Sequence, residues 1–134
     1  MSFQEKRAWV YAVVTLIVPA AYFVTVLGQE PPAEYAAPML IAIGAGIAAN
    51  ILGVIGSAIL APEHVGLNDE RDKSIDQYGK RAGYGALAIG AVAALALTLA
   101  RFEHFWIANT LYLGFVLDGL TTSVVKIVAY RRGF

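Results

Sequence analysis

Cysteine is absent from this chain of 134 residues, and histidine occurs only twice. These absences exclude disulfides and thiolate-bound metals, and they leave no histidine pair at the spacing of a zinc or haem site. Charge is also scarce, because charged residues make up 15% of the chain, against about 25% in an average soluble domain. So little charge excludes a soluble enzyme core and a nucleic-acid binder, and an apolar content of 58% excludes a disordered tail.

Most of the apolar residues lie in four long runs, of which only the last contains a charged residue, Asp118. A helix of roughly 20 apolar residues crosses the core of a bilayer. The sequence therefore predicts an all-α, polytopic membrane protein, a four-transmembrane-helix bundle of two antiparallel hairpins. It forms one domain, residues 1–134, with spans at about 8–27, 36–61, 80–100 and 105–128.

Basic residues are distributed unevenly around these spans. Arg101 alone lies in a loop that follows the first or third span, and the other nine lie near the termini or the loop after the second span. Because basic residues near span ends stay on the cytoplasmic side, we expect a multi-pass cell-membrane protein with cytoplasmic N- and C-termini.

Small residues recur at four-residue spacing in the second and third spans. Such stripes let helix backbones approach closely in a bilayer, where burial of large apolar side chains gives no driving force. We expect these two spans to pack on each other or across a dimer, and we expect a homo-oligomer. The residues are Ala45, Ala49, Gly53 and Ser57, followed by Ala82, Ala86, Gly90 and Ala94.

Asp118 is the one acidic residue inside a predicted span. A charged side chain at the centre of a bilayer is costly, so it normally faces a partner or water. Asn50 is expected at a similar depth, and Thr122 lies one turn from Asp118 on the same helix face. These three residues form either a cation- or proton-binding site of a small transporter or channel, or a structural polar clamp.

The densest charged stretch is 68–76, between the second and third spans. Asn68 is a good N-cap, and the acids that follow it suit the first turn of a helix. Asp76 and Lys80 form an acid-to-base pair at i,i+4 spacing. We therefore predict that the third helix begins here, outside the bilayer, and continues into its span.

Asn68, Asp69, Asp72 and Asp76 in this stretch also match the pattern Asn-Asp-x-x-Asp-x-x-x-Asp. This pattern resembles the first aspartate-rich motif of the intramembrane aromatic prenyltransferases. The resemblance implies Mg²⁺ bound by the three aspartates against a prenyl diphosphate. Those enzymes have about twice as many spans and a second aspartate motif, which is missing here.

A longer resemblance involves the Asp69-Glu70-Arg71-Asp72 segment, Ile75, the entry into an apolar helix between the small residues Gly79 and Ala82, and the stretches 105–109 and 130–132. These features are similar to a family of small four-span integral membrane proteins from bacteria, and they look actinobacterial. The family has no assigned activity. The resemblance implies an accessory or regulatory protein of the bacterial inner membrane. Most of the water-accessible charge lies in the loop after the second span and in the C-terminal tail, so we expect this cytoplasmic loop to contact a protein partner.

Three functions therefore stay open: the accessory protein, the small transporter that uses Asp118 and Asn50, and the Mg²⁺-dependent prenyl-diphosphate enzyme. The first is favoured, and it needs no cofactor, no catalytic residue and no nucleic acid. No serine has a nearby histidine, and no phosphate-binding glycine motif is present, so the sequence supplies no other catalytic arrangement.

Overall fold

The computed structural model describes residues 3–28, 35–60 and 70–132, and in these ranges the chain is helical with no strand. Four long helices follow one another: α1 (Phe3–Leu27), α2 (Ala36–Leu60), α3 (Glu70–Leu99) and α4 (His104–Arg132). Each is long and apolar enough to cross a membrane. The all-α, four-helix prediction is confirmed, and the four apolar helices are compatible with a multi-pass membrane protein.

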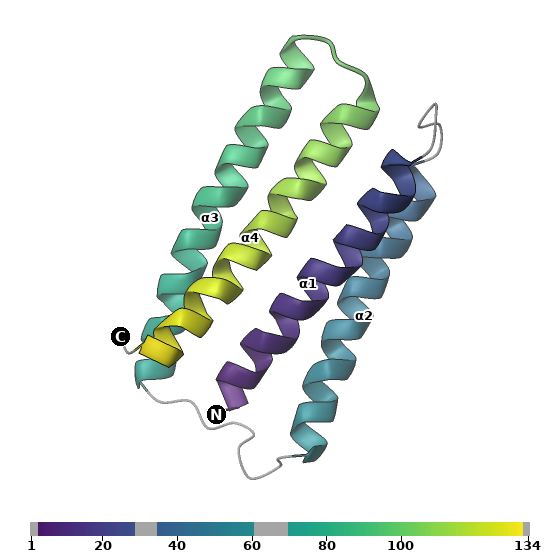
Figure 1. The fold of residues 1–134 in the computed structure, drawn as a ribbon. Coiled ribbons are helices and arrows are strands. Elements are labelled where there is room, and N and C mark those ends of the chain that lie inside the picture. The colour runs from purple at the N-terminus through teal and green to yellow at the C-terminus, as the bar shows by residue number, and fades with distance from the viewer. Residues whose placement is uncertain (1–2, 29–34, 61–69, 133–134) are drawn as a thin grey trace. The chain divides into compact units, whose positions relative to one another are not determined.

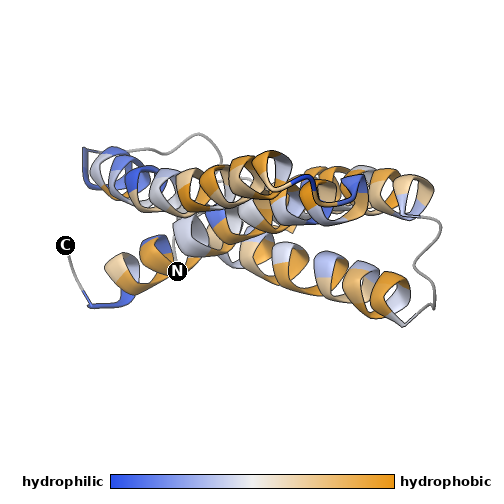
Figure 2. Ribbon diagram, turned by 90° about the horizontal axis from the view of Figure 1, so that it is seen from above, coloured by the Kyte–Doolittle hydropathy of each residue, from blue (hydrophilic) through white to orange (hydrophobic). Residues whose placement is uncertain are grey.

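The chain divides into two compact units, residues 1–67 and 68–134. In the first unit α1 packs on α2, and in the second α3 packs on α4, so each unit is an antiparallel hairpin (Figure 1). We call them the first and the second hairpin. The end of the second hairpin at which α3 begins and α4 ends is called its open end. Figure 2 shows hydrophobic colour along most of the helices and hydrophilic colour beside the C-terminus.

Helix α3 is longer than its predicted span, because it begins at Glu70 rather than near residue 80. It runs without a break through the four glycines in its sequence. Three of them lie against α4, where a Cβ on Gly79, Gly83 or Gly90 would contact α4 atoms, so close packing explains the presence of these three. The predicted helix in the charged segment is confirmed from Glu70 onwards, while Asn68 and Asp69 lie outside the described residues.

The turn between α3 and α4 is a Schellman motif. The amide of Phe102 donates to the carbonyl of Leu97 at 3.0 Å, and the amide of Arg101 donates to the carbonyl of Thr98 at 3.1 Å. Arg101 adopts a φ of 61°, in the left-handed region that glycine occupies most readily. This turn brings α4 back along α3, as the short connection in the sequence predicts.

Replacing Arg101 by glycine is expected to stabilise the second hairpin by about 1 kcal/mol, because glycine relieves the cost of left-handed backbone for an L-residue. The measurement is denaturant unfolding of the purified protein in mixed micelles. Ala100→Gly is the matched control, since its φ is not positive, and it is expected to be neutral or destabilising. Equal effects of both substitutions would contradict this account of the turn.

Candidate functional site

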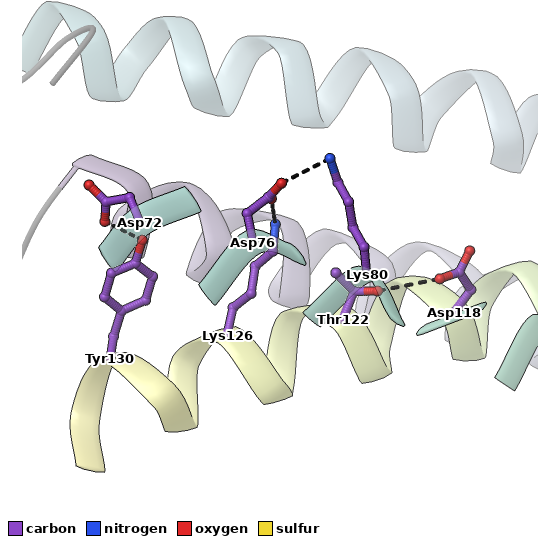
Figure 3. Close-up of polar contacts among 7 residues, drawn as sticks. All are labelled: Asp72, Asp76, Lys80, Asp118, Thr122, Lys126 and Tyr130. Atoms are coloured by element: carbon purple, nitrogen blue, oxygen red, sulfur yellow. Dashed lines mark hydrogen bonds and ion pairs between the residues drawn. The ribbon is translucent and has the colours of Figure 1, made fainter. Parts of the chain in front are cut away.

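Charged side chains of α3 and α4 meet at the open end of the second hairpin. Lys126 Nζ on α4 lies 2.5 Å from Asp76 Oδ1 on α3. The second oxygen of the same carboxylate, Oδ2, lies 2.9 Å from Lys80 Nζ, one turn further along α3. Figure 3 shows the Asp76 carboxylate between these two ammonium groups. The pair at i,i+4 was predicted from the sequence, whereas the contact with α4 was not.

Tyr130, near the end of α4, makes a second set of contacts with α3. Its hydroxyl donates to Asp72 Oδ1 at 2.5 Å (Figure 3). The guanidinium of Arg71 lies 5.6 Å from the centroid of the Tyr130 ring, and its Nη2 donates to the Tyr130 carbonyl at 3.3 Å. The positive charge of Arg71 therefore lies beside the last turn of α4, where it complements the helix dipole.

These contacts show why the acids of α3 point towards α4. Asp72 and Asp76 are one turn apart on α3, and Lys126 and Tyr130 are one turn apart on α4. Residues four apart share a face of a helix. In an antiparallel pair of helices, two residues at this spacing on one helix therefore face two residues at the same spacing on the other. The sequence analysis did not identify Lys126 and Tyr130 as partners of these acids. The short turn at 100–103 and the equal four-residue spacing on the two helices are the features from which this pairing could be predicted.

Deeper in the same hairpin, Asp118 and Thr122 pack against the backbone of α3. Thr122 Oγ1 donates to Asp118 Oδ1 at 3.3 Å (Figure 3). Both oxygens occupy the space into which a Cβ on Gly83 would project, and the Asp118 carbonyl oxygen lies 2.9 Å from that Cβ position. Such close approach permits weak Cα–H hydrogen bonds from glycine to oxygen, which recur at helix–helix interfaces. Asp118 is therefore half-buried at a packed interface.

Asn50, the residue expected to pair with Asp118, lies on α2 in the first hairpin. Its side-chain amide donates to the Gly46 carbonyl, one turn earlier on the same helix, at 3.0 Å. The Asn50–Asp118 hydrogen bond and the transport site built on it stay predictions. Their test is ion flux into liposomes: the transport hypothesis requires that Asp118→Asn abolishes flux without changing assembly.

In each predicted packing stripe, the glycine contacts the other helix of its own hairpin. On α3, Gly90 faces α4, where a Cβ would lie 2.7 Å from the Cα of Gly114. On α2, a Cβ on Gly53 would overlap the side chain of Val10 on α1. Of the other stripe residues, Ala94 is buried, Ala49, Ala82 and Ala86 are half-buried, Ala45 is exposed, and the Ser57 side chain lies outside the described residues. Packing of α2 on α3, or across a dimer, stays a prediction.

The acids of the aspartate-rich pattern are described in part. Asn68 and Asp69 lie outside the described residues, while Asp72 and Asp76 bind the tyrosine and the lysine of α4. In the described part of the chain, no three histidine, cysteine, aspartate or glutamate side chains gather closely enough to hold a metal ion. The Mg²⁺ and prenyl-diphosphate hypothesis stays a prediction, and it would require Asp72 and Asp76 to exchange these partners for a cation.

Comparison of the chain with protein-family models, with curated proteins and with solved structures finds no match. The candidate site is therefore interpreted from its own geometry. That geometry joins two helices through an ion pair, a tyrosine–aspartate hydrogen bond and glycine contacts, all of which hold α3 and α4 together.

Proposed function

We propose that this protein is an accessory or regulatory protein of a bacterial inner membrane, and that the open end of its second hairpin contacts a cytoplasmic protein partner. The proposal includes cytoplasmic N- and C-termini. Nine of the ten basic residues lie on the side assigned to the cytoplasm, which is the distribution that the positive-inside rule associates with that side. The resemblance to small four-span bacterial membrane proteins favours the same location.

The observation that carries the proposal is the extension of α3 beyond its apolar run. The uncharged run begins at Ala82, but the helix begins at Glu70. At 1.5 Å per residue, the polar part of α3 rises about 18 Å from the start of that run. The last residues of α4, 126–132, accompany it. We call these two segments, 70–81 and 126–132, the projection.

Contacts between the two helices order the projection before any partner binds. The Asp76–Lys126 ion pair and the Asp72–Tyr130 hydrogen bond join its helices at two successive turns. A surface that is already ordered loses less conformational entropy when a partner binds. This property suits a docking element better than an unstructured charged loop would.

The outward side of the projection carries the groups that remain for a partner. Glu70, Lys73, Ser74 and Gln77 are exposed on α3, whereas Asp72 and Asp76 are half-buried against α4. The half-buried acids therefore stabilise the hairpin, whereas the exposed polar side chains are available to bind a partner.

The proposal is tested with a photo-crosslinking residue at Gln77, on the projection, and at Ala88, an exposed position within the apolar part of α3. We expect the Gln77 probe to crosslink a specific protein in living cells and the Ala88 probe not to. The adduct is expected to fall several-fold in the double variant Glu70→Gln, Lys73→Gln.

Arg101→Gln, a charge removed at the other end of the hairpin, is the matched control and is expected to leave the adduct unchanged. Identical adducts from Gln77 and Ala88, or an adduct insensitive to the charges of Glu70 and Lys73, would contradict the proposal.

A further inference from the structure

A group of exposed basic and aromatic side chains surrounds the point at which α3 enters its apolar run. Arg81 is the residue immediately before that run, and it is exposed. Tyr78 and Tyr84 lie one turn on either side of it with 54% and 63% of their surfaces exposed. Tyrosines at this level are typical of the membrane–water interface, where the ring lies among lipid and the hydroxyl reaches water.

Arg81 differs from Arg71, Lys80 and Lys126 in having no partner among the described residues. Lys126 and Lys80 bind Asp76, and Arg71 binds the Tyr130 carbonyl. Within residues 70–132, no hydrogen bond or ion pair engages Arg81. The exposed guanidinium lies at the edge of the apolar run, and its planar fork matches the oxygens of a phosphate.

The charge of the whole projection points to an anionic ligand. Its two segments hold seven basic residues and three acidic ones, which leaves an excess of four positive charges. The opposite end of the hairpin, at 101–104, has one basic and one acidic residue and no excess. A positive excess confined to one end attracts the negative headgroups of the adjacent leaflet.

We propose that Arg81, with Lys80 and Tyr84 beside it on α3, binds the headgroup of an anionic phospholipid. The guanidinium donates to the phosphate oxygens, and the lysine ammonium adds attraction while it stays paired with Asp76. Tyr84 lies against the upper part of the acyl chains. The site lies at the level of the headgroups, below the outward groups at 70–77, so it does not depend on the partner proposed above.

The test is a titration of the purified full chain in detergent with phosphatidylglycerol or phosphatidylcholine, with bound lipid counted by native mass spectrometry. We expect phosphatidylglycerol to bind more tightly than phosphatidylcholine. Arg81→Gln removes one interfacial basic residue, and it is expected to raise the dissociation constant for phosphatidylglycerol about fivefold. Arg81→Lys is expected to restore only part of the affinity, because it keeps the charge but lacks the planar fork.

Arg101→Gln is the matched control, since it removes an exposed arginine from the other end of the same hairpin. It is expected to bind as the unchanged protein does, and the helical content of each variant is measured by circular dichroism. Equal affinity for the two lipids, or equal losses in Arg81→Gln and Arg101→Gln, would overturn the proposal. An acidic peptide is also added as a competitor. If it displaces phosphatidylglycerol from the unchanged protein but not from Arg81→Gln, the ligand of Arg81 is a protein and the proposal is overturned.

Discussion

Replacing Gly90 by alanine is expected to weaken the packing of α3 on α4 by about 1–3 kcal/mol, the usual cost of overpacking a close contact. A Cβ at this position would lie 2.7 Å from the Cα of Gly114. The obstructing atom belongs to the backbone, so no side chain can rotate away and the two helices must separate. Helices in a bilayer depend on such close approach, because lipid supplies no hydrophobic force between them.

Gly85→Ala is the matched control for Gly90→Ala. Gly85 lies on the same helix, and nothing lies within 4 Å of a Cβ placed there. Alanine is the better helix former by about 1 kcal/mol, so this control is expected to be neutral or stabilising. The free energy of separating α3 from α4 is measured by steric trapping in bicelles. Equal destabilisation by both alanines would show that Gly90 is not a packing contact.

Reversing the charge of Lys126 is expected to have a comparable effect, about 2 kcal/mol, at the open end of the hairpin. In Lys126→Glu, a second carboxylate takes the position of the ammonium that lies 2.5 Å from Asp76. The side chains of Lys126 and Asp76 are 22% and 41% exposed. The expected loss of stability is therefore larger than for a surface ion pair and smaller than for a buried one. The same steric-trapping measurement applies.

Lys80 provides the control for this experiment, because it lies on the same helix as Asp76 whereas Lys126 lies on the other. Lys80 also binds Asp76, but from the same helix and with 57% of its side chain exposed. Lys80→Glu is therefore expected to change helix separation by only a few tenths of a kcal/mol. The swapped double variant Asp76→Lys, Lys126→Glu is expected to recover part of the lost stability, because the lysine introduced at position 76 also lies beside Lys80. No difference between the two single variants would contradict the assignment of Lys126 as the cross-helix partner.

The sequence is sufficient to predict the helices, because apolar length and turn residues act locally. The four runs, the short turn after α3 and the Asp76–Lys80 pair follow from residues close together in the chain. The start of α3 in the charged segment follows from the preference of acids for the first turn of a helix. In each of these cases, the residues that determine the structure lie within a few turns of one another.

Contacts between helices are harder to predict, because they depend on which faces meet. The α3 stripe was recognised as small residues, but the contact of Gly90 with Gly114 on α4 needs the register that the turn at Arg101 sets. The aspartates of α3 suggested a cation site, yet Lys126 and Tyr130 supply their partners from more than 45 residues away in the chain. Pattern alone does not distinguish a metal ligand from half of an ion pair.

The proposed orientation places the polar part of α3 in the cytoplasm, as a helix joined to α4. Because the chain has no cysteine, single cysteines at Gln77 and at Val92 report this directly through a membrane-impermeant maleimide. We predict that Cys at position 77 reacts in inside-out vesicles and not in intact spheroplasts, and that Cys at position 92 reacts in neither. Reaction at position 77 from the outside, or protection of it on both sides, would contradict this orientation.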